Sequence, residues 1–190
     1  MIEPRLERFL VDHLPMRQVW PRGRDLHTHL TGTYALLARW GNAPDVCHAG
    51  LFHSIYGTWC VRHDAFPLDR RNVVQALIGL RAEQLVYVFC VTTRLQAFLG
   101  HKSGQVVELH DHHANHALLV PPDELRDLRE IEAANLIEQG AMARITLRQL
   151  YETSISDAAK GEIERALSLS SPVKPCVQVR LRRVAGGVAS

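Results

Sequence analysis

The chain lacks the features that would place it in several large classes of protein. Its longest apolar runs, such as Leu85 to Val91, are far shorter than the roughly 20 residues that a membrane-spanning helix needs. Neither sign of charge dominates, with 22 Lys and Arg against 20 Asp and Glu. The net charge of the chain therefore does not indicate nucleic acid or a membrane as a partner. The sequence opens without a basic and apolar leader segment, and we therefore expect a cytoplasmic protein.

Cysteine is also scarce, and its spacing excludes a CxxC motif. The four cysteines lie far apart, three of them in apolar surroundings, so we expect reduced side chains that pack in the interior. They are Cys47, Cys60, Cys90 and Cys176.

What the chain does have is apolar periodicity. With 190 residues and 46% hydrophobic content it is long enough for a single domain, which we place at residues 1–184, with a flexible tail at 185–190. A polar turn between two apolar runs predicts a β-hairpin over 104–122, and alternation over 177–183 predicts a last strand that could pair with it. The expected fold is mainly α, with helices near 3–13, 26–40, 44–56, 68–79, 81–98, 123–140, 142–152 and 156–169.

Two histidines stand out because each lies in a strongly apolar predicted helix. His29 and His53 are 24 residues apart, with one helix turnaround at Gly41 to Pro44, so antiparallel packing would bring them close together. A neutral imidazole is buried without a large free-energy cost only when its nitrogens find partners. The pair therefore indicates a shared polar pocket, and the alternative is two core histidines that are satisfied separately.

The segments HLTGTYALLARWG, AGLFHSIYGT and IEAANLIEQG carry a resemblance to a known superfamily. Over roughly residues 25–99 the chain resembles the HD-domain superfamily of helical metalloenzymes, in which one histidine precedes an adjacent His-Asp pair on the next helix. The layout of LFHSIYGT and the segment that follows is similar to the hydrolase half of guanosine tetraphosphate hydrolase/synthetases. The likeness is closer still to an uncharacterised bacterial group of HD-like proteins. This resemblance implies an HD-domain-like helical bundle.

The chain departs from the superfamily pattern at the acidic positions. Ser54 stands where the ligand aspartate belongs, and Tyr56 and Gly57 stand where the hydrolase carries its acidic pair. In the superfamily a second ligand aspartate often precedes an Arg-Leu pair, and Thr93 holds the most similar place here. A divalent ion held by neutral imidazoles without a carboxylate has little charge compensation, so we expect no metal cofactor.

A divalent Fe, Mn or Zn ion is the alternative for the cofactor. Two histidines and one carboxylate form a good site for such ions. The third ligand would then come from Asp64, Glu83 or Glu132.

The function we expect is that of a small-molecule enzyme in which His29 and His53 act as an acid–base or substrate-orienting pair. Histidine suits this role because its pKa lies near operating pH. Ser54 and Tyr56 complete the expected catalytic group, and the reaction would be an elimination, isomerisation or cyclisation. The residues expected to bind the substrate are Thr33, Thr58, Arg94, Glu132 and Asn135.

Two other functions remain open: a metal-dependent HD phosphohydrolase or oxygenase with altered ligands, and a non-catalytic ligand-binding module. In each case the expected partner is a small molecule, with no nucleic acid and no membrane, and the sequence does not determine the oligomeric state. The polar turn with His110, His112, His113 and His116 is expected to be an exposed surface turn. Arg180, Arg182 and Arg183 suit an exposed edge strand.

Overall fold

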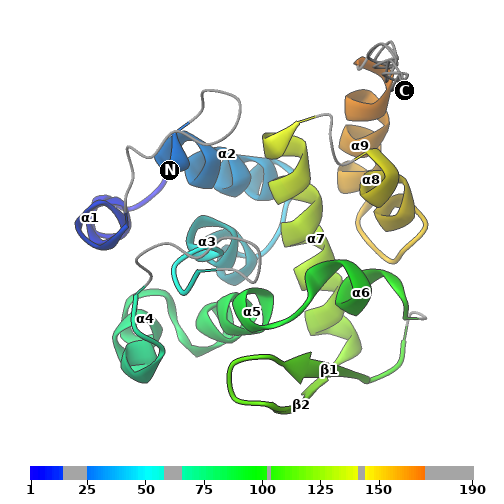
Figure 1. Cartoon of the computed structure of the whole chain (residues 1–190). Coiled ribbons are helices and arrows are strands. Elements are labelled where there is room, and N and C mark those ends of the chain that lie inside the picture. The colour runs from blue at the N-terminus through cyan, green and yellow to red at the C-terminus, as the bar shows by residue number, and fades with distance from the viewer. Residues whose placement is uncertain (15–24, 58–65, 102–103, 141–143, 170–190) are drawn as a thin grey trace, which may run out of the picture.

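The computed structural model describes residues 1–14, 25–57, 66–101, 104–140 and 144–169. This part of the chain is mainly α-helical with one small antiparallel sheet, which confirms the expected fold class (Figure 1). None of the described helices has both the length and the apolar character that a bilayer crossing requires. The predicted strand at 177–183 and the tail at 185–190 lie outside the described residues.

The helices and strands follow one another along the chain in the order labelled in Figure 1. They are α1 (Pro4–His13), α2 (Leu26–Arg39), α3 (Pro44–Phe52), the short 3₁₀ helix η1 (Leu68–Arg70), α4 (Arg71–Ile78), α5 (Leu80–Val91), α6 (Arg94–Leu99), β1 (Val107–Asp111), β2 (His116–Val120), α7 (Pro122–Gln139), α8 (Arg144–Tyr151) and α9 (Asp157–Leu169).

The helix predicted at 81–98 is in fact two helices, α5 and α6. Thr92 interrupts it with an extended backbone (φ −104°, ψ 158°), and its hydroxyl donates to the Val88 carbonyl at 2.8 Å. The Val91 carbonyl accepts a hydrogen bond of 3.0 Å from the backbone N–H of His112, in the hairpin turn. The break therefore depends on a partner 21 residues away in the sequence (112 − 91), which periodicity cannot detect.

The helix predicted at 44–56 also ends early, at Phe52. The His53 ring nitrogen Nδ1 donates to the Gly50 carbonyl at 2.7 Å, which occupies an acceptor near the end of the helix. Beyond it the chain continues in i→i+3 turns, from Ile55 N–H to the Phe52 carbonyl and from Gly57 N–H to the Ser54 carbonyl. The side chain of His53 thus lies at the point where α3 unwinds.

The β-hairpin is present as predicted. Strands β1 and β2 pair with Asp111 opposite His116, and the turn between them is closed with Asn115 at a positive φ of 55°. The Asp111 carboxylate accepts the backbone N–H groups of His113 and Ala114, both at 2.8 Å, so it holds the turn in place. The imidazoles of the turn are exposed, as expected of a surface turn.

Helix α7 is the centre of the structure. It packs against α2, α3, α5, α6, α8 and α9, and Figure 1 shows it running between the N-terminal and the C-terminal helices. Because α7 is covered on most sides, both apolar and polar residues along it are buried. Buried polar groups require internal partners, and those of α7 find them on the helices and turns packed around it.

Helices α2 and α3 approach each other closely at Gly50. A Cβ atom added at Gly50 would lie 2.2 Å from Leu37 Cδ1 and 3.4 Å from Thr33 Cγ2, and Leu37 is fully buried. Only glycine leaves room for this contact. The close approach brings the histidine-bearing ends of the two helices together.

We expect Gly50→Ala to lower the free energy of unfolding by about 1 kcal/mol. Overpacking against Leu37 costs about 1–3 kcal/mol, which exceeds the gain in helix propensity of about 1 kcal/mol. Gly161→Ala in α9 is the matched control, because its added Cβ would meet no other described part of the structure within 4 Å, and it should be stabilising by about that propensity gain. Chemical denaturation of both variants measures the difference. Equal stabilisation of both would show that α2 and α3 are not in close contact at Gly50.

Candidate functional site

The two imidazoles predicted to converge lie against each other in the interior. His29 belongs to α2 and His53 follows α3, and the two side chains are buried. Their Nε2 atoms are 3.2 Å apart, and the ring planes stand at 85° to each other. The histidines are therefore hydrogen-bonded to one another, unlike two core histidines that are satisfied separately.

The protonation of His53 follows from its second contact. Its Nδ1 lies 2.7 Å from the Gly50 carbonyl oxygen, which can only accept, so Nδ1 carries the hydrogen. In the neutral ring Nε2 is then an acceptor. The hydrogen of the imidazole pair must therefore lie on Nε2 of His29, which donates to Nε2 of His53.

The surroundings of His53 keep it neutral. Burial lowers its pKa well below the usual 6.5, and the neighbouring His29 and Arg94 lower it further. The Gly50 carbonyl and the Asn135 side chain act in the opposite direction and are outweighed. At neutral pH the His53 ring is thus an uncharged base.

A set of polar side chains from α7 and α6 lies beside His53. Glu132 is buried and accepts from Arg94 at 3.2 Å and from Asn135 Nδ2 at 3.1 Å. Burial raises the pKa of the Glu132 carboxyl, whereas Arg94 and Asn135 lower it. Gln139 extends the chain of hydrogen bonds by donating to Asn135 Oδ1 at 2.8 Å.

Phe89 connects these side chains to the imidazoles. The Arg94 guanidinium lies over its ring, 4.8 Å from the centroid, and the His53 ring meets it edge to face at 5.4 Å. Five of the residues predicted for the site therefore gather in one place. We call them the imidazole cluster: His29, His53, Arg94, Glu132 and Asn135.

Other residues predicted for the site do not bond to the imidazole rings in the described structure. The Tyr56 hydroxyl donates to Glu83 Oε1 at 2.9 Å, because a buried phenol needs an acceptor and Glu83 supplies it. The Thr33 hydroxyl donates to the His29 carbonyl within its own helix, at 2.9 Å. Ser54 is buried, and no interaction among the described residues joins its hydroxyl to either imidazole. Thr58 lies outside the described residues.

The sequence did not predict the second polar cluster, which is built around Glu83. This fully buried carboxylate accepts from Arg71 Nε and Nη2 at 2.6 and 2.8 Å and from Gln75 at 2.9 Å, in addition to Tyr56. Burial and the Glu83 charge raise the pKa of Tyr56 far above its usual value. Because Glu83 is satisfied by these donors, the cluster ties α4 to α5 and holds Tyr56 away from the imidazoles.

Within the described residues, neither Glu83 nor Glu132 makes a hydrogen bond to the imidazole pair, although Glu132 belongs to the imidazole cluster. Glu83 is bound by Arg71 and Glu132 by Arg94, and Asp64 lies outside the described residues. Within the described ranges, no group of three or more His, Cys, Asp and Glu side chains is placed to hold a metal ion.

These observations define a mainly α-helical protein with a buried imidazole pair beside a buried ion pair. Residues 10–94 match the protein-family model described as "Domain of unknown function (DUF6817)". The matched segment includes both imidazoles and ends at Arg94, so α7, with Glu132 and Asn135, lies beyond it. A search of curated proteins and a search of solved structures each found no match.

We expect the stability of the protein to depend on pH through His53. Its folded pKa is lowered below 6.5, so below that pH the unfolded state binds a proton that the folded state does not. The free energy of unfolding should fall on acidification below 6.5 by up to about 1.4 kcal/mol per pH unit from this group. Urea denaturation between pH 7.5 and 5.5 measures the slope.

The variant His53→Gln is the comparison, because it keeps a donor for the Gly50 carbonyl and removes the titration. Glu132, whose pKa is raised, contributes a slope of opposite sign that both proteins share. Subtracting the two curves isolates His53. Identical pH dependence in both proteins would contradict a neutral, buried His53.

Proposed function

We propose that the protein is a small-molecule enzyme in which His29 and His53 form an acid–base pair. The observation that carries the proposal is the 3.2 Å contact between the two Nε2 atoms, together with the Gly50 carbonyl that fixes the hydrogen on His53 Nδ1. A base at this position is already in its unprotonated form at neutral pH. The partial resemblance to HD-domain enzymes, which use the same two histidine positions, is consistent with a catalytic role.

The pair favours proton transfer that begins and ends on the same substrate. A proton taken up at His53 Nε2 displaces the hydrogen bond from His29, and the resulting imidazolium is a strong acid because it is buried beside Arg94. It therefore returns the proton readily to another atom of the substrate. This order of proton transfers suits an elimination, isomerisation or cyclisation. Positioned proton transfer of this kind gives about 10²–10⁴-fold acceleration.

The remaining members of the imidazole cluster are suited to binding the polar part of the substrate. Arg94 is partly exposed, with 17% of its side chain accessible, and it holds Glu132 on one side and the Phe89 ring on the other. Asn135 donates a hydrogen bond to Glu132, and its side chain acts to raise the pKa of His53. We infer that Arg94 and Asn135 orient the substrate, while Glu132 holds both of them in position.

The test is proton exchange with solvent. In D₂O the protein should incorporate deuterium into those members of a panel of small hydroxy and carbonyl metabolites that stabilise it in a thermal shift assay. His53→Gln should slow this exchange at least 100-fold, in line with the loss of a positioned base. The control is His27→Gln, because this histidine is on α2 but is 43% exposed and paired with Glu7.

Two outcomes contradict the acid–base proposal. One is exchange that His53→Gln leaves unchanged. The other is a set of ligands that bind without any exchange, which would identify a ligand-binding module.

A metal-dependent enzyme is the second candidate, and one observation favours it. Nitrogen ligands at about 2.0–2.1 Å from a tetrahedral ion lie about 3.4 Å apart, close to the 3.2 Å between the Nε2 atoms. In such an enzyme His29 and His53 would hold the ion, which would act as a Lewis acid. Elemental analysis of protein purified without a histidine tag distinguishes the candidates: stoichiometric Fe, Mn or Zn that is lost in His53→Ala supports the metal-dependent enzyme.

A further inference from the structure

A cavity lies on the opposite face of α7 from the imidazole cluster. It has a volume of about 410 Å³, is open to solvent on one side, and is bounded by the turn between α2 and α3, the first half of α7 and the turn before α9. None of the imidazole cluster residues lines it. The lining includes Trp40, Asn42, Val46, Arg126, Ser154 and Ile155. We call it the Trp40 cavity.

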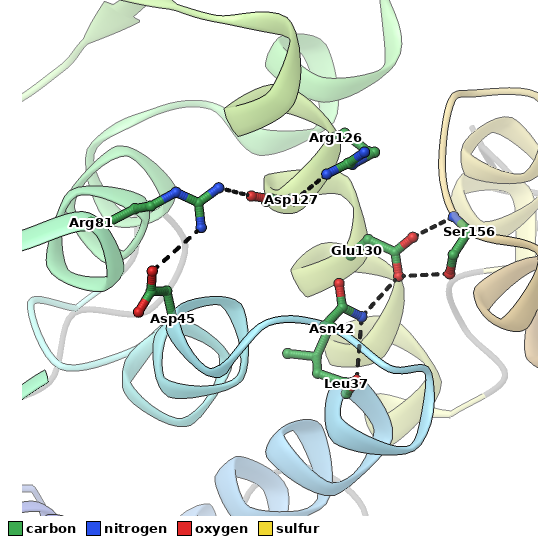
Figure 2. A network of polar contacts seen from close by, with 8 residues as sticks. All are labelled: Leu37, Asn42, Asp45, Arg81, Arg126, Asp127, Glu130 and Ser156. Atoms are coloured by element: carbon green, nitrogen blue, oxygen red, sulfur yellow. Dashed lines mark hydrogen bonds and ion pairs between the residues drawn. The ribbon is translucent and has the colours of Figure 1, made fainter. Parts of the chain in front are cut away.

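The two buried carboxylates of the Trp40 cavity are already satisfied. Glu130 accepts from the backbone N–H and the hydroxyl of Ser156, and from Asn42 Nδ2 at 3.3 Å. Asp127 forms ion pairs with both Arg81 and Arg126. Figure 2 shows both guanidinium groups directed at Asp127, and Glu130 between Asn42 and Ser156. These acids therefore have little remaining capacity to hold a cationic ligand.

The groups around the Trp40 cavity that can still form hydrogen bonds are N–H and O–H donors. Trp40 is 8% exposed, and its buried Nε1–H has no partner among the residues that the structure describes, which is costly for a buried donor. Arg126, whose side chain is 56% exposed, has Asp127 as its one polar partner within the described part of the chain, at 3.5 Å. The Ser154 oxygen accepts from Arg129 at 3.1 Å, which leaves its O–H to donate.

The unused donors stand beside apolar walls. Val46, Ile155 and the Trp40 ring are buried and line the same cavity. The volume lies within the range of about 300–1,000 Å³ that is typical of small-molecule sites. A ligand that fits these walls has an apolar body and a group that only accepts hydrogen bonds.

We propose that the Trp40 cavity binds a small organic anion. Its carboxylate or phosphate group accepts from Arg126 and the Ser154 hydroxyl, and its apolar body lies against Val46 and Ile155. The Trp40 side chain turns its Nε1–H toward the ligand and so gains the partner that it lacks. The site is independent of the imidazole pair, and its occupation does not require the proposed reaction.

The experiment uses ¹⁵N-labelled full-length protein and four probes: benzoate, phenyl phosphate, benzyl alcohol and benzylamine. The Nε1–H resonance of Trp40, assigned by its loss in Trp40→Phe, should shift saturably with the anions and not with the neutral or cationic probe. Tighter binding of phenyl phosphate identifies phosphate as the preferred group, and tighter binding of benzoate identifies a carboxylate.

Arg126→Gln should weaken binding of the preferred anion about tenfold. The fold should persist, because Asp127 keeps Arg81 as its partner. Arg148→Gln, an exposed arginine of α8 outside the cavity, should leave binding unchanged. The proposal is overturned if neither anion shifts Trp40 saturably, if benzylamine binds as well as the anions, or if the two arginine variants behave alike.

Discussion

The hydrogen bond between His29 and His53 is the contact on which the site depends. It requires α2 and α3 to approach closely, and Gly50 permits this because a side chain there would meet Leu37. The carbonyl of the same glycine fixes the proton on His53 Nδ1. One residue without a side chain thus sets both the distance between the imidazoles and the direction of the hydrogen bond between them.

Helix α7 connects this pair to the rest of the molecule. Glu132 and Asn135 lie toward His53 and Arg94, whereas Asp127 and Glu130 frame the Trp40 cavity. A buried carboxylate is tolerated only when donors surround it, and each of the three acids has them. The polar side chains of α7 therefore fix the positions of its neighbours, with the imidazole cluster on one side of the helix and the Trp40 cavity on the other.

The sequence predicted the parts of the structure that depend on local pattern. Apolar periodicity located the helices and the hairpin, and the 24-residue spacing predicted that His29 and His53 would meet. It did not predict the break at Thr92 or the direction of Tyr56, because these depend on His112 and on Glu83, which are distant in the sequence. The sequence singled out Glu83 only as a possible metal ligand, because the donors that surround it come from α4 and from Tyr56.

The most direct measurement is ¹⁵N NMR of the histidine rings at neutral pH. Two-bond couplings identify which nitrogen of each neutral ring carries the hydrogen. The structure predicts that His53 is protonated at Nδ1 and bare at Nε2, and that it stays in this form below pH 6.5. A His53 ring protonated at Nε2, or one that titrates near 6.5, would contradict the imidazole pair as described.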